Sequence, residues 1–149
     1  MPNQILELKD FPYVIDRKVA WSDVDSFQHV NSVQYLRYFE DIRAEYLYKI
    51  GIKETLKKSN IGIVVGSITA KYLSPMSYPD TAITGIRVAS IEEKKFLLTY
   101  IIVSKESGLK VVEGETLIFA YDISKGKSTA IPETWLHLMK EIQPDLCLK

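Results

Sequence analysis

Residues 21–50 read WSDVDSFQHVNSVQYLRYFEDIRAEYLYKI, and the second part of this stretch has the spacing of an α-helix. From Ser32 to Ile50, apolar side chains recur every three or four residues, which is the period of one helix face. Asn31 or Ser32 can cap the start, and Gly51 ends the pattern. The opposite face carries oppositely charged pairs four residues apart, so the helix is amphipathic and needs an apolar surface to cover. The apolar positions are Val33, Leu36, Phe39, Ile42, Tyr46, Leu47 and Ile50.

Strand-like segments lie on both sides of this helix in the sequence. Val14 to Trp21 reads as a first strand, and Glu133 to Ile142 reads as a last short helix. Four strand-like runs lie between the two helices, separated by turn residues and by no crossover element. The sequence therefore predicts an α+β fold with an antiparallel five-stranded sheet packed against the long helix. The four runs are Ile61 to Tyr72, Thr81 to Ile91, Phe96 to Ser104 and Val111 to Asp122.

The composition limits the kind of protein that this chain can be. Its 149 residues carry 19 Lys and Arg against 19 Asp and Glu and are 46% hydrophobic, which is typical of one domain spanning 1–149. Zero net charge without a basic run argues against a nucleic-acid partner. Cys147 is the only cysteine, so no disulfide can form within the chain. The N-terminus is too polar for a signal peptide and no apolar run could cross a membrane, so we expect a cytoplasmic protein without a membrane partner.

The densest group of reactive side chains lies between the first strand and the long helix. Residues 21–31 include Asp23, Asp25, His29 and Asn31. This segment ends at a helix N-terminus, where free backbone N–H groups and the positive end of the helix dipole favour developing negative charge. We therefore expect the chemistry of the protein here.

Residues 21–43 resemble the signature of the hotdog-fold thioesterases of the 4-hydroxybenzoyl-CoA thioesterase type. The shared pattern is an aromatic residue, an Asp-x-Asp pair, a His-Val-Asn step and a Tyr-x-x-Tyr-Phe-Glu helix. The order of elements is similar from about Val14 to Asp122, including Tyr-Leu-Ser-Pro at 72–75. The resemblance implies a hotdog fold and hydrolysis of acyl-CoA thioesters in a homodimer or homotetramer. No cofactor is implied, since coenzyme A is part of the substrate.

The resemblance also assigns the two groups that would act on the thioester. In the family, the second Asp of the pair is the nucleophile or general base, and this position is Asp25. A backbone amide seven residues later polarises the thioester carbonyl, and this position is Ser32. One carboxylate and one oxyanion site can suffice because a thiolate leaves readily. Gln28 stands where many members have glycine, which predicts either another loop path or a differently shaped acyl pocket.

Seven further residues are candidate substrate contacts. His29 could orient the substrate, Asn31 could cap the helix or position His29, and Tyr35 could line an acyl pocket.

The other four candidates come from the predicted sheet. Val65 and Ser67, on the strand 61–72, would come from a second subunit. Lys94 and Lys95 occupy the hairpin that, in the resembling family, approaches the phosphates of coenzyme A.

Plainer roles stay open for the same side chains. Asp25 could simply hydrogen-bond the nearby backbone, and Asp23 could support the loop. Glu40 could be the helix carboxylate that some other hotdog thioesterases use, or a surface partner of a neighbouring arginine. Asp23, Asp25 and His29 have the donor types of a metal site, but nothing repeats at ligand spacing, so no metal is expected.

Two other functions fit the sequence. A thioesterase of this fold could act on acyl carrier protein, and a chain of this fold could bind acyl-CoA without hydrolysing it. A hotdog dehydratase is disfavoured, because residues 28–31 lack the His followed by Pro and Gly that those enzymes carry.

Overall fold

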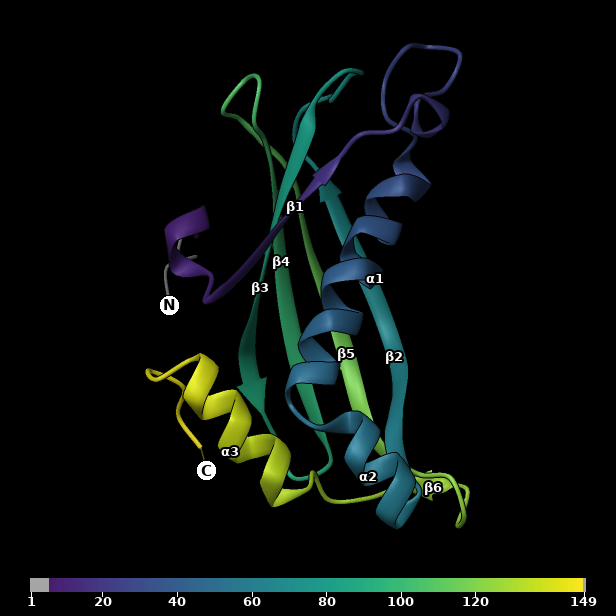
Figure 1. Ribbon diagram of the computed structural model, residues 1–149, viewed down its shortest axis with the longest axis vertical. Coiled ribbons are helices and arrows are strands. Elements are labelled where there is room, and N and C mark those ends of the chain that lie inside the picture. The colour runs from purple at the N-terminus through teal and green to yellow at the C-terminus, as the bar shows by residue number, and fades with distance from the viewer. Residues whose placement is uncertain (1–5, 149) are drawn as a thin grey trace.

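The computed structural model describes residues 6–148, in which one long helix, α1, lies against a curled antiparallel sheet (Figure 1). This is the predicted hotdog fold. Residues 1–5 and 149, at the ends of the predicted domain, lie outside the described part, and so does half of the polar N-terminal segment 1–10. The helices are α1 (Ser32–Lys49), α2 (Ile52–Ser59) and α3 (Glu133–Ile142). The strands are β1 (Tyr13–Lys18), β2 (Ile61–Tyr72), β3 (Thr81–Ile91), β4 (Lys95–Ser104), β5 (Lys110–Asp122) and β6 (Lys127–Ser128).

The sheet has the strand order β1-β3-β4-β5-β2, with the two-residue β6 paired to the end of β5. All pairs are antiparallel, as predicted. The predicted first strand was too long: β1 ends at Lys18, and Trp21–Asp23 forms a 3-10 turn. The Asp23 carboxylate closes this turn by accepting from the Ala20 amide at 2.9 Å. The short helix α2 was not predicted.

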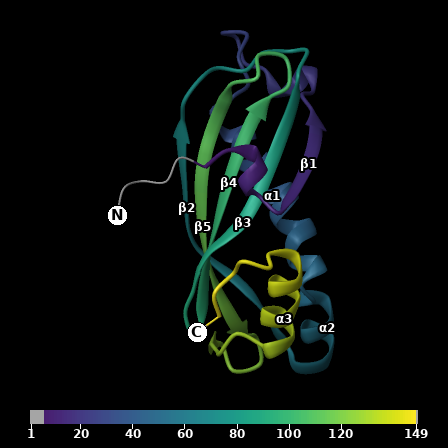
Figure 2. The same cartoon turned by 90° about the vertical axis from the view of Figure 1, so that its left-hand side faces the viewer.

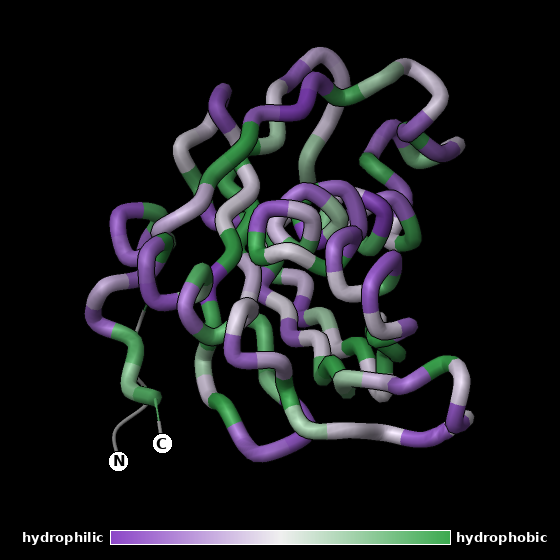
Figure 3. Tube along the Cα trace, turned by 60° about the horizontal axis from the view of Figure 1, so that its bottom comes forward, coloured by the Kyte–Doolittle hydropathy of each residue, from purple (hydrophilic) through white to green (hydrophobic). Residues whose placement is uncertain are grey.

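The core lies between α1 and the inner face of the sheet. Phe39 of α1 stacks on Tyr100 of β4, with ring centroids 4.5 Å apart and planes 19° apart. Gly114 of β5 lies under the same ring, and a Cβ there would be 2.4 Å from the Phe39 Cε2 atom. Gly114 therefore allows the helix to approach the sheet closely. Figure 3 shows the helix as a coil enclosed by the curve of the sheet.

One edge of the sheet, strand β2, is open to solvent (Figure 2). Residues 61–70 contain no charge, and three large apolar side chains of the strand are exposed: Val64 by 42%, Ile68 by 43% and Tyr72 by 49%. A bulge at Gly66 shifts the register between Val65 and Ser67. A long, apolar edge with unpaired backbone groups is the surface onto which another strand adds.

The opposite edge is closed in two ways. Its upper part is β1, which is short and charged and whose Arg17 pairs with Asp41 of α1 at 2.7 Å. Below β1, the buried Gln143 carboxamide accepts from the Val88 amide and donates to the Val88 carbonyl, both at 2.9 Å. At the bulge of β3, the Gln143 side chain thus makes the two backbone hydrogen bonds that a neighbouring strand would otherwise make. None of the helices in residues 6–148 is both long and apolar enough to cross a membrane.

Candidate active site

The acidic segment folds into a tight loop between β1 and α1. Val24 and Val30 form an antiparallel bridge, and the Asp25 amide donates to the His29 carbonyl at 3.0 Å. The Val30 amide donates to the carbonyl of Met76 at 2.7 Å, which ties the loop to the segment between β2 and β3. The predicted cluster of reactive side chains therefore lies on a loop whose backbone is fixed by hydrogen bonds.

Asp25 combines a fixed oxygen with a free one. Its Oδ1 accepts from the Phe27 amide at 2.9 Å, as the plainer interpretation expects. Its Oδ2 has no hydrogen-bond partner in the part of the chain that the structure describes. The fixed oxygen orients the carboxylate, and the free oxygen is available to a substrate or a water molecule.

A cavity of about 460 Å³ opens in front of Asp25. Its wall also includes His29 and Gln28, and its rim is aromatic: Trp21 is 75% exposed and Phe27 80% exposed. Large apolar side chains with this exposure are typical of a surface that receives a ligand or a partner. The other lining residues are Val24, Ser77 and Tyr78.

Gln28 adopts a backbone conformation that favours glycine. Its φ is 65°, in the left-handed region, and its amide donates to the Asp25 carbonyl at 2.9 Å. Glycine adopts this backbone conformation readily, whereas for glutamine the left-handed conformation is strained. The Gln28 side chain lines the cavity in front of Asp25.

Replacing Gln28 with glycine should raise the free energy of unfolding by about 0.5–1 kcal/mol. Relief of left-handed strain is worth roughly 1–2 kcal/mol and exceeds the extra entropy of glycine in the unfolded chain. Urea unfolding measures the change. Ala44→Gly, in the middle of α1, is the control and should lower stability by about 1 kcal/mol. A destabilised Gln28→Gly variant would contradict the expectation.

The start of α1 presents one free backbone amide. Asn31 caps the helix: its Oδ1 accepts from the Val33 amide at 3.0 Å, and its carbonyl accepts from the Gln34 amide at 2.9 Å. The Ser32 amide, which precedes both, has no partner among residues 6–148. It is the N–H that the resemblance assigns to the thioester oxygen, and the helix dipole adds to its pull on negative charge.

Two tyrosines hold this region in place, a role that the sequence did not predict for either. The Tyr72 hydroxyl, at the end of β2, donates to the Ser32 carbonyl at 2.9 Å. The Tyr38 hydroxyl donates to the Asp23 Oδ2 at 2.7 Å. Burial, and to a lesser extent this hydrogen bond, raises the Tyr38 pKa far above its usual value. The Asp23 carboxylate therefore holds the loop in place through its hydrogen bonds with the Ala20 amide and the Tyr38 hydroxyl. Tyr38 belongs to the motif quoted above, but no sequence signal links Tyr72 to a residue 40 positions away.

Tyr35 lies in the core and does not line the cavity in front of Asp25. Its ring packs against those of Tyr72 and Tyr38, at centroid distances of 5.7 and 6.1 Å. Burial raises the Tyr35 pKa to about 12, so the hydroxyl stays protonated at neutral pH. Within one chain, its contacts are those of a core residue.

The other predicted contacts lie away from Asp25 within one chain. Val65 and Ser67 flank the bulge in the middle of β2, on the open edge. Lys94 and Lys95 lie at the turn between β3 and β4, at the end of the sheet opposite the acidic loop (Figure 1). The structure therefore places Asp25 and His29 on one cavity, with Asn31 and Ser32 at the adjoining start of α1. Val65, Ser67, Lys94 and Lys95 lie apart from them.

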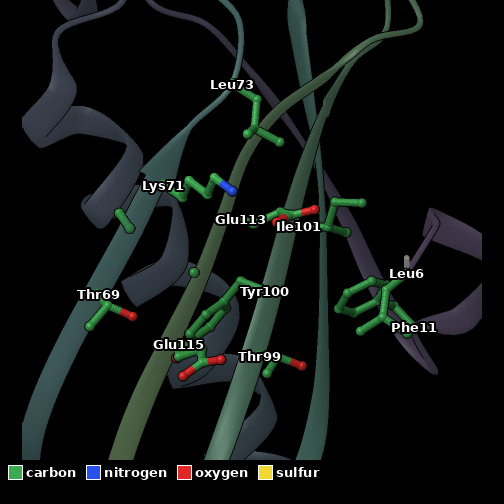
Figure 4. A pocket seen from close by; sticks show the side chains of 12 residues that line it. Leu6, Phe11, Thr69, Lys71, Leu73, Thr99, Tyr100, Ile101, Glu113 and Glu115 are labelled. Atoms are coloured by element: carbon green, nitrogen blue, oxygen red, sulfur yellow. The ribbon is translucent and has the colours of Figure 1, made fainter. Parts of the chain in front are cut away.

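A larger cavity, about 650 Å³, lies on the outer face of the sheet (Figure 4). Its wall includes Lys71, Glu113 and Glu115 but no residue of the acidic loop. No group of three or more His, Cys, Asp or Glu side chains within 6–148 is placed to hold a metal ion. The free carboxylate oxygen and the free helix amide thus mark the acidic loop as the candidate active site.

Comparisons with known proteins identify the family of the chain and agree with its fold. Residues 19–139 match the model of the thioesterase-like superfamily. The long-chain acyl-CoA thioesterase FadM of Escherichia coli is 25% identical over 114 residues, covering 76% of this chain and 86% of that protein. A Thermus thermophilus thioesterase complexed with coenzyme A and Zn superposes with a TM-score of 0.81 at 19% identity, covering 93% and 99% of the two chains. A 1,4-dihydroxy-2-naphthoyl-CoA thioesterase from Synechocystis gives 0.76 at 15% identity, covering 85% and 94%.

Proposed function

The chain belongs to the thioesterase-like superfamily, and from this premise we propose that it hydrolyses acyl-CoA thioesters at the Asp25 loop. The observation that carries the proposal is an oriented Asp25 carboxylate, with Oδ2 free, in a loop that leads directly into the helix start, where the Ser32 amide is free. The 4-hydroxybenzoyl-CoA type motif in residues 21–43 supports the same assignment. CoA-bound relatives of the same fold support coenzyme A as the thiol carrier.

The reaction needs a base or nucleophile and a donor to the carbonyl oxygen. As general base, Asp25 takes a proton from water, and the water oxygen bonds to the thioester carbon. The C–S bond then breaks, coenzyme A leaves as a thiolate and takes up the proton, and the acid is released. As nucleophile, Asp25 displaces the thiolate itself, and water then hydrolyses the acyl anhydride. In both routes the Ser32 amide binds the oxygen that becomes negative, an interaction worth roughly 3 kcal/mol.

The proposed enzyme is a homodimer built on β2, or a tetramer of such dimers. Pairing of two β2 edges would cover the exposed Ile68 and Val64 and extend one sheet through both subunits. The resemblance assigns Val65 and Ser67 of one subunit to the acyl pocket of the other, and both residues lie on the β2 edge along which the two chains would pair. The acyl pocket would then be shared between subunits.

Free-thiol release from a panel of short-chain, long-chain and aromatic acyl-CoAs tests the function directly. We expect turnover of at least one of them, and the best substrate defines the acyl pocket. The same acyl groups on acyl carrier protein are measured in parallel, and faster release from that carrier would favour the carrier-protein alternative. Binding of acyl-CoA, seen as a raised melting temperature, without thiol release from any substrate would contradict hydrolysis and favour a non-catalytic acyl-CoA-binding protein.

A further inference from the structure

Tyr72, at the end of the edge strand β2, reaches across to the first turn of α1. Its hydroxyl donates to the Ser32 carbonyl at 2.9 Å. In Figure 1 the end of β2 lies beside the start of α1. The carbonyl that accepts this hydrogen bond and the free amide proposed for the thioester oxygen belong to the same residue. Only the φ and ψ rotations of Ser32 separate the two groups, so a fixed carbonyl limits how far the amide can turn.

The strand end that carries Tyr72 is itself fixed to the sheet. The amide of the next residue, Leu73, donates to the Val111 carbonyl at 2.8 Å. The hydrogen bonds of Asn31, in contrast, tie the helix start only to its own first turn and to the acidic loop, through the Asp23 carbonyl at 2.9 Å. The Tyr72 hydroxyl thus holds the helix start from a strand, which positions a group more accurately than a loop does.

Tyr72 is the first of three tyrosines whose rings pack in a row. Its ring centroid is 5.7 Å from that of Tyr35, which is 6.1 Å from that of Tyr38. The Tyr38 hydroxyl donates to the Asp23 carboxylate at 2.7 Å. The row therefore connects the end of β2 with both parts of the candidate site, the helix start and the acidic loop.

The hydrogen bond of Tyr72 is placed to affect rate more than stability. The Tyr72 residue is 49% exposed, and water can replace a hydrogen bond that is lost at an exposed position, so the net contribution to folding is small. Catalysis is more sensitive, because a small displacement of a donor weakens its bond to the oxygen that becomes negative in the transition state.

We propose that Tyr72 is a positioning residue for thioester hydrolysis: its hydroxyl holds the Ser32 carbonyl so that the Ser32 amide meets the thioester oxygen in the transition state. This inference rests on the proposed function. Within one chain, Tyr72 does not line the cavity in front of Asp25, so its effect on the reaction passes through Ser32.

The first experiment compares thiol release by Tyr72→Phe and by the native chain. The substitution keeps the ring that packs on Tyr35 and removes the hydroxyl, so we expect kcat to fall about tenfold with KM unchanged. Incorporation of 4-aminophenylalanine at position 72 returns an N–H donor to the same ring and should restore most of kcat. Tyr48→Phe is the matched control: Tyr48 is 58% exposed, its hydroxyl accepts from Lys53 at 3.3 Å, and its loss should leave kcat unchanged.

Each other outcome of this experiment contradicts the assignment. A native kcat in Tyr72→Phe, a fall that 4-aminophenylalanine does not restore, or a rise in KM alone would overturn the role of Tyr72. Urea unfolding should shift no more for Tyr72→Phe than for Tyr48→Phe, and a much larger shift would make Tyr72 a structural residue. The absence of thiol release by the native chain would overturn the proposed function together with this role, whereas the preceding results overturn the role alone.

The second experiment reads the Ser32 hydrogen bond without turnover. In Asp25→Asn, where hydrolysis is slow, a bound acyl-CoA with a ¹³C-labelled thioester carbonyl is observed by infrared spectroscopy. A hydrogen bond from the Ser32 amide lowers the C=O stretching frequency, and adding Tyr72→Phe should move the band back to higher frequency. An unchanged band in the double variant would overturn the role of Tyr72. A band that is not lowered in Asp25→Asn itself would overturn the assignment of the Ser32 amide as well.

Discussion

Asp25→Asn should lower kcat/KM for thiol release by about a hundredfold or more. The substitution removes the charge of Oδ2, the oxygen that has no partner, and with it the base or nucleophile of the proposed reaction. The amide oxygen of Asn can still accept from the Phe27 amide, so the loop should keep its path. Thiol release under kcat/KM conditions measures the loss, and urea unfolding checks that both proteins fold equally.

Asp23→Asn is the matched control for this experiment. Asp23 lies two residues away but is engaged by the Ala20 amide and the Tyr38 hydroxyl. We therefore expect Asp23→Asn to lower stability more than Asp25→Asn does and to cost less activity in the protein that remains folded. If Asp25→Asn were as active as the native chain, Asp25 would be only a loop residue and the candidate site would be wrong.

Ile68→Lys should convert the proposed dimer into monomers and abolish most of its activity. Ile68 is exposed in one chain but would be covered when two β2 edges pair. Burying an unpaired ammonium group from each subunit costs several kcal/mol, which raises the dimer dissociation constant by about a thousandfold or more. Light scattering after size-exclusion chromatography gives the mass, and thiol release gives the activity.

Val14→Lys is the control for the effect of a new charge on an edge strand. Val14 is 39% exposed on β1, at the other edge of the sheet, and its substitution should leave mass and activity unchanged. A dimeric Ile68→Lys protein would place the subunit contact elsewhere. A fully active monomer would show that Val65 and Ser67 of a second subunit are not part of the acyl pocket.

Periodicity was enough to predict the long helix and the long strands of this fold. The apolar stripe that includes Phe39 and Ile42 runs along the five turns of α1, and β2 and β3 have the predicted bounds. Helix α2 was missed because it has only eight residues and its polar face dominates the pattern. Its existence depends on contacts such as that of Leu56 with Gly62, which sequence spacing alone does not reveal.

The candidate site was predictable to the extent that it is local. Asp25, His29 and Asn31 fall within one short segment, so a motif could identify them. The hydrogen bond from Tyr72 to Ser32 joins residues 40 positions apart and depends on the packing of β2 beside α1. The left-handed backbone of Gln28 was likewise hidden, because the residue type argues against the conformation that the loop uses. The roles of these residues in catalysis remain predictions that the variants above test.

The Gln143 carboxamide has a consequence for how many copies can join. A sheet with two receptive edges can add chains without limit, and fibrils grow in this way. Here short, charged β1 and the paired Val88 backbone close one side, so strand-to-strand addition through β2 would end after a single step. Any assembly of the proposed dimer beyond two copies would then have to use faces instead of edges, so strand addition would be self-limiting even at high protein concentration.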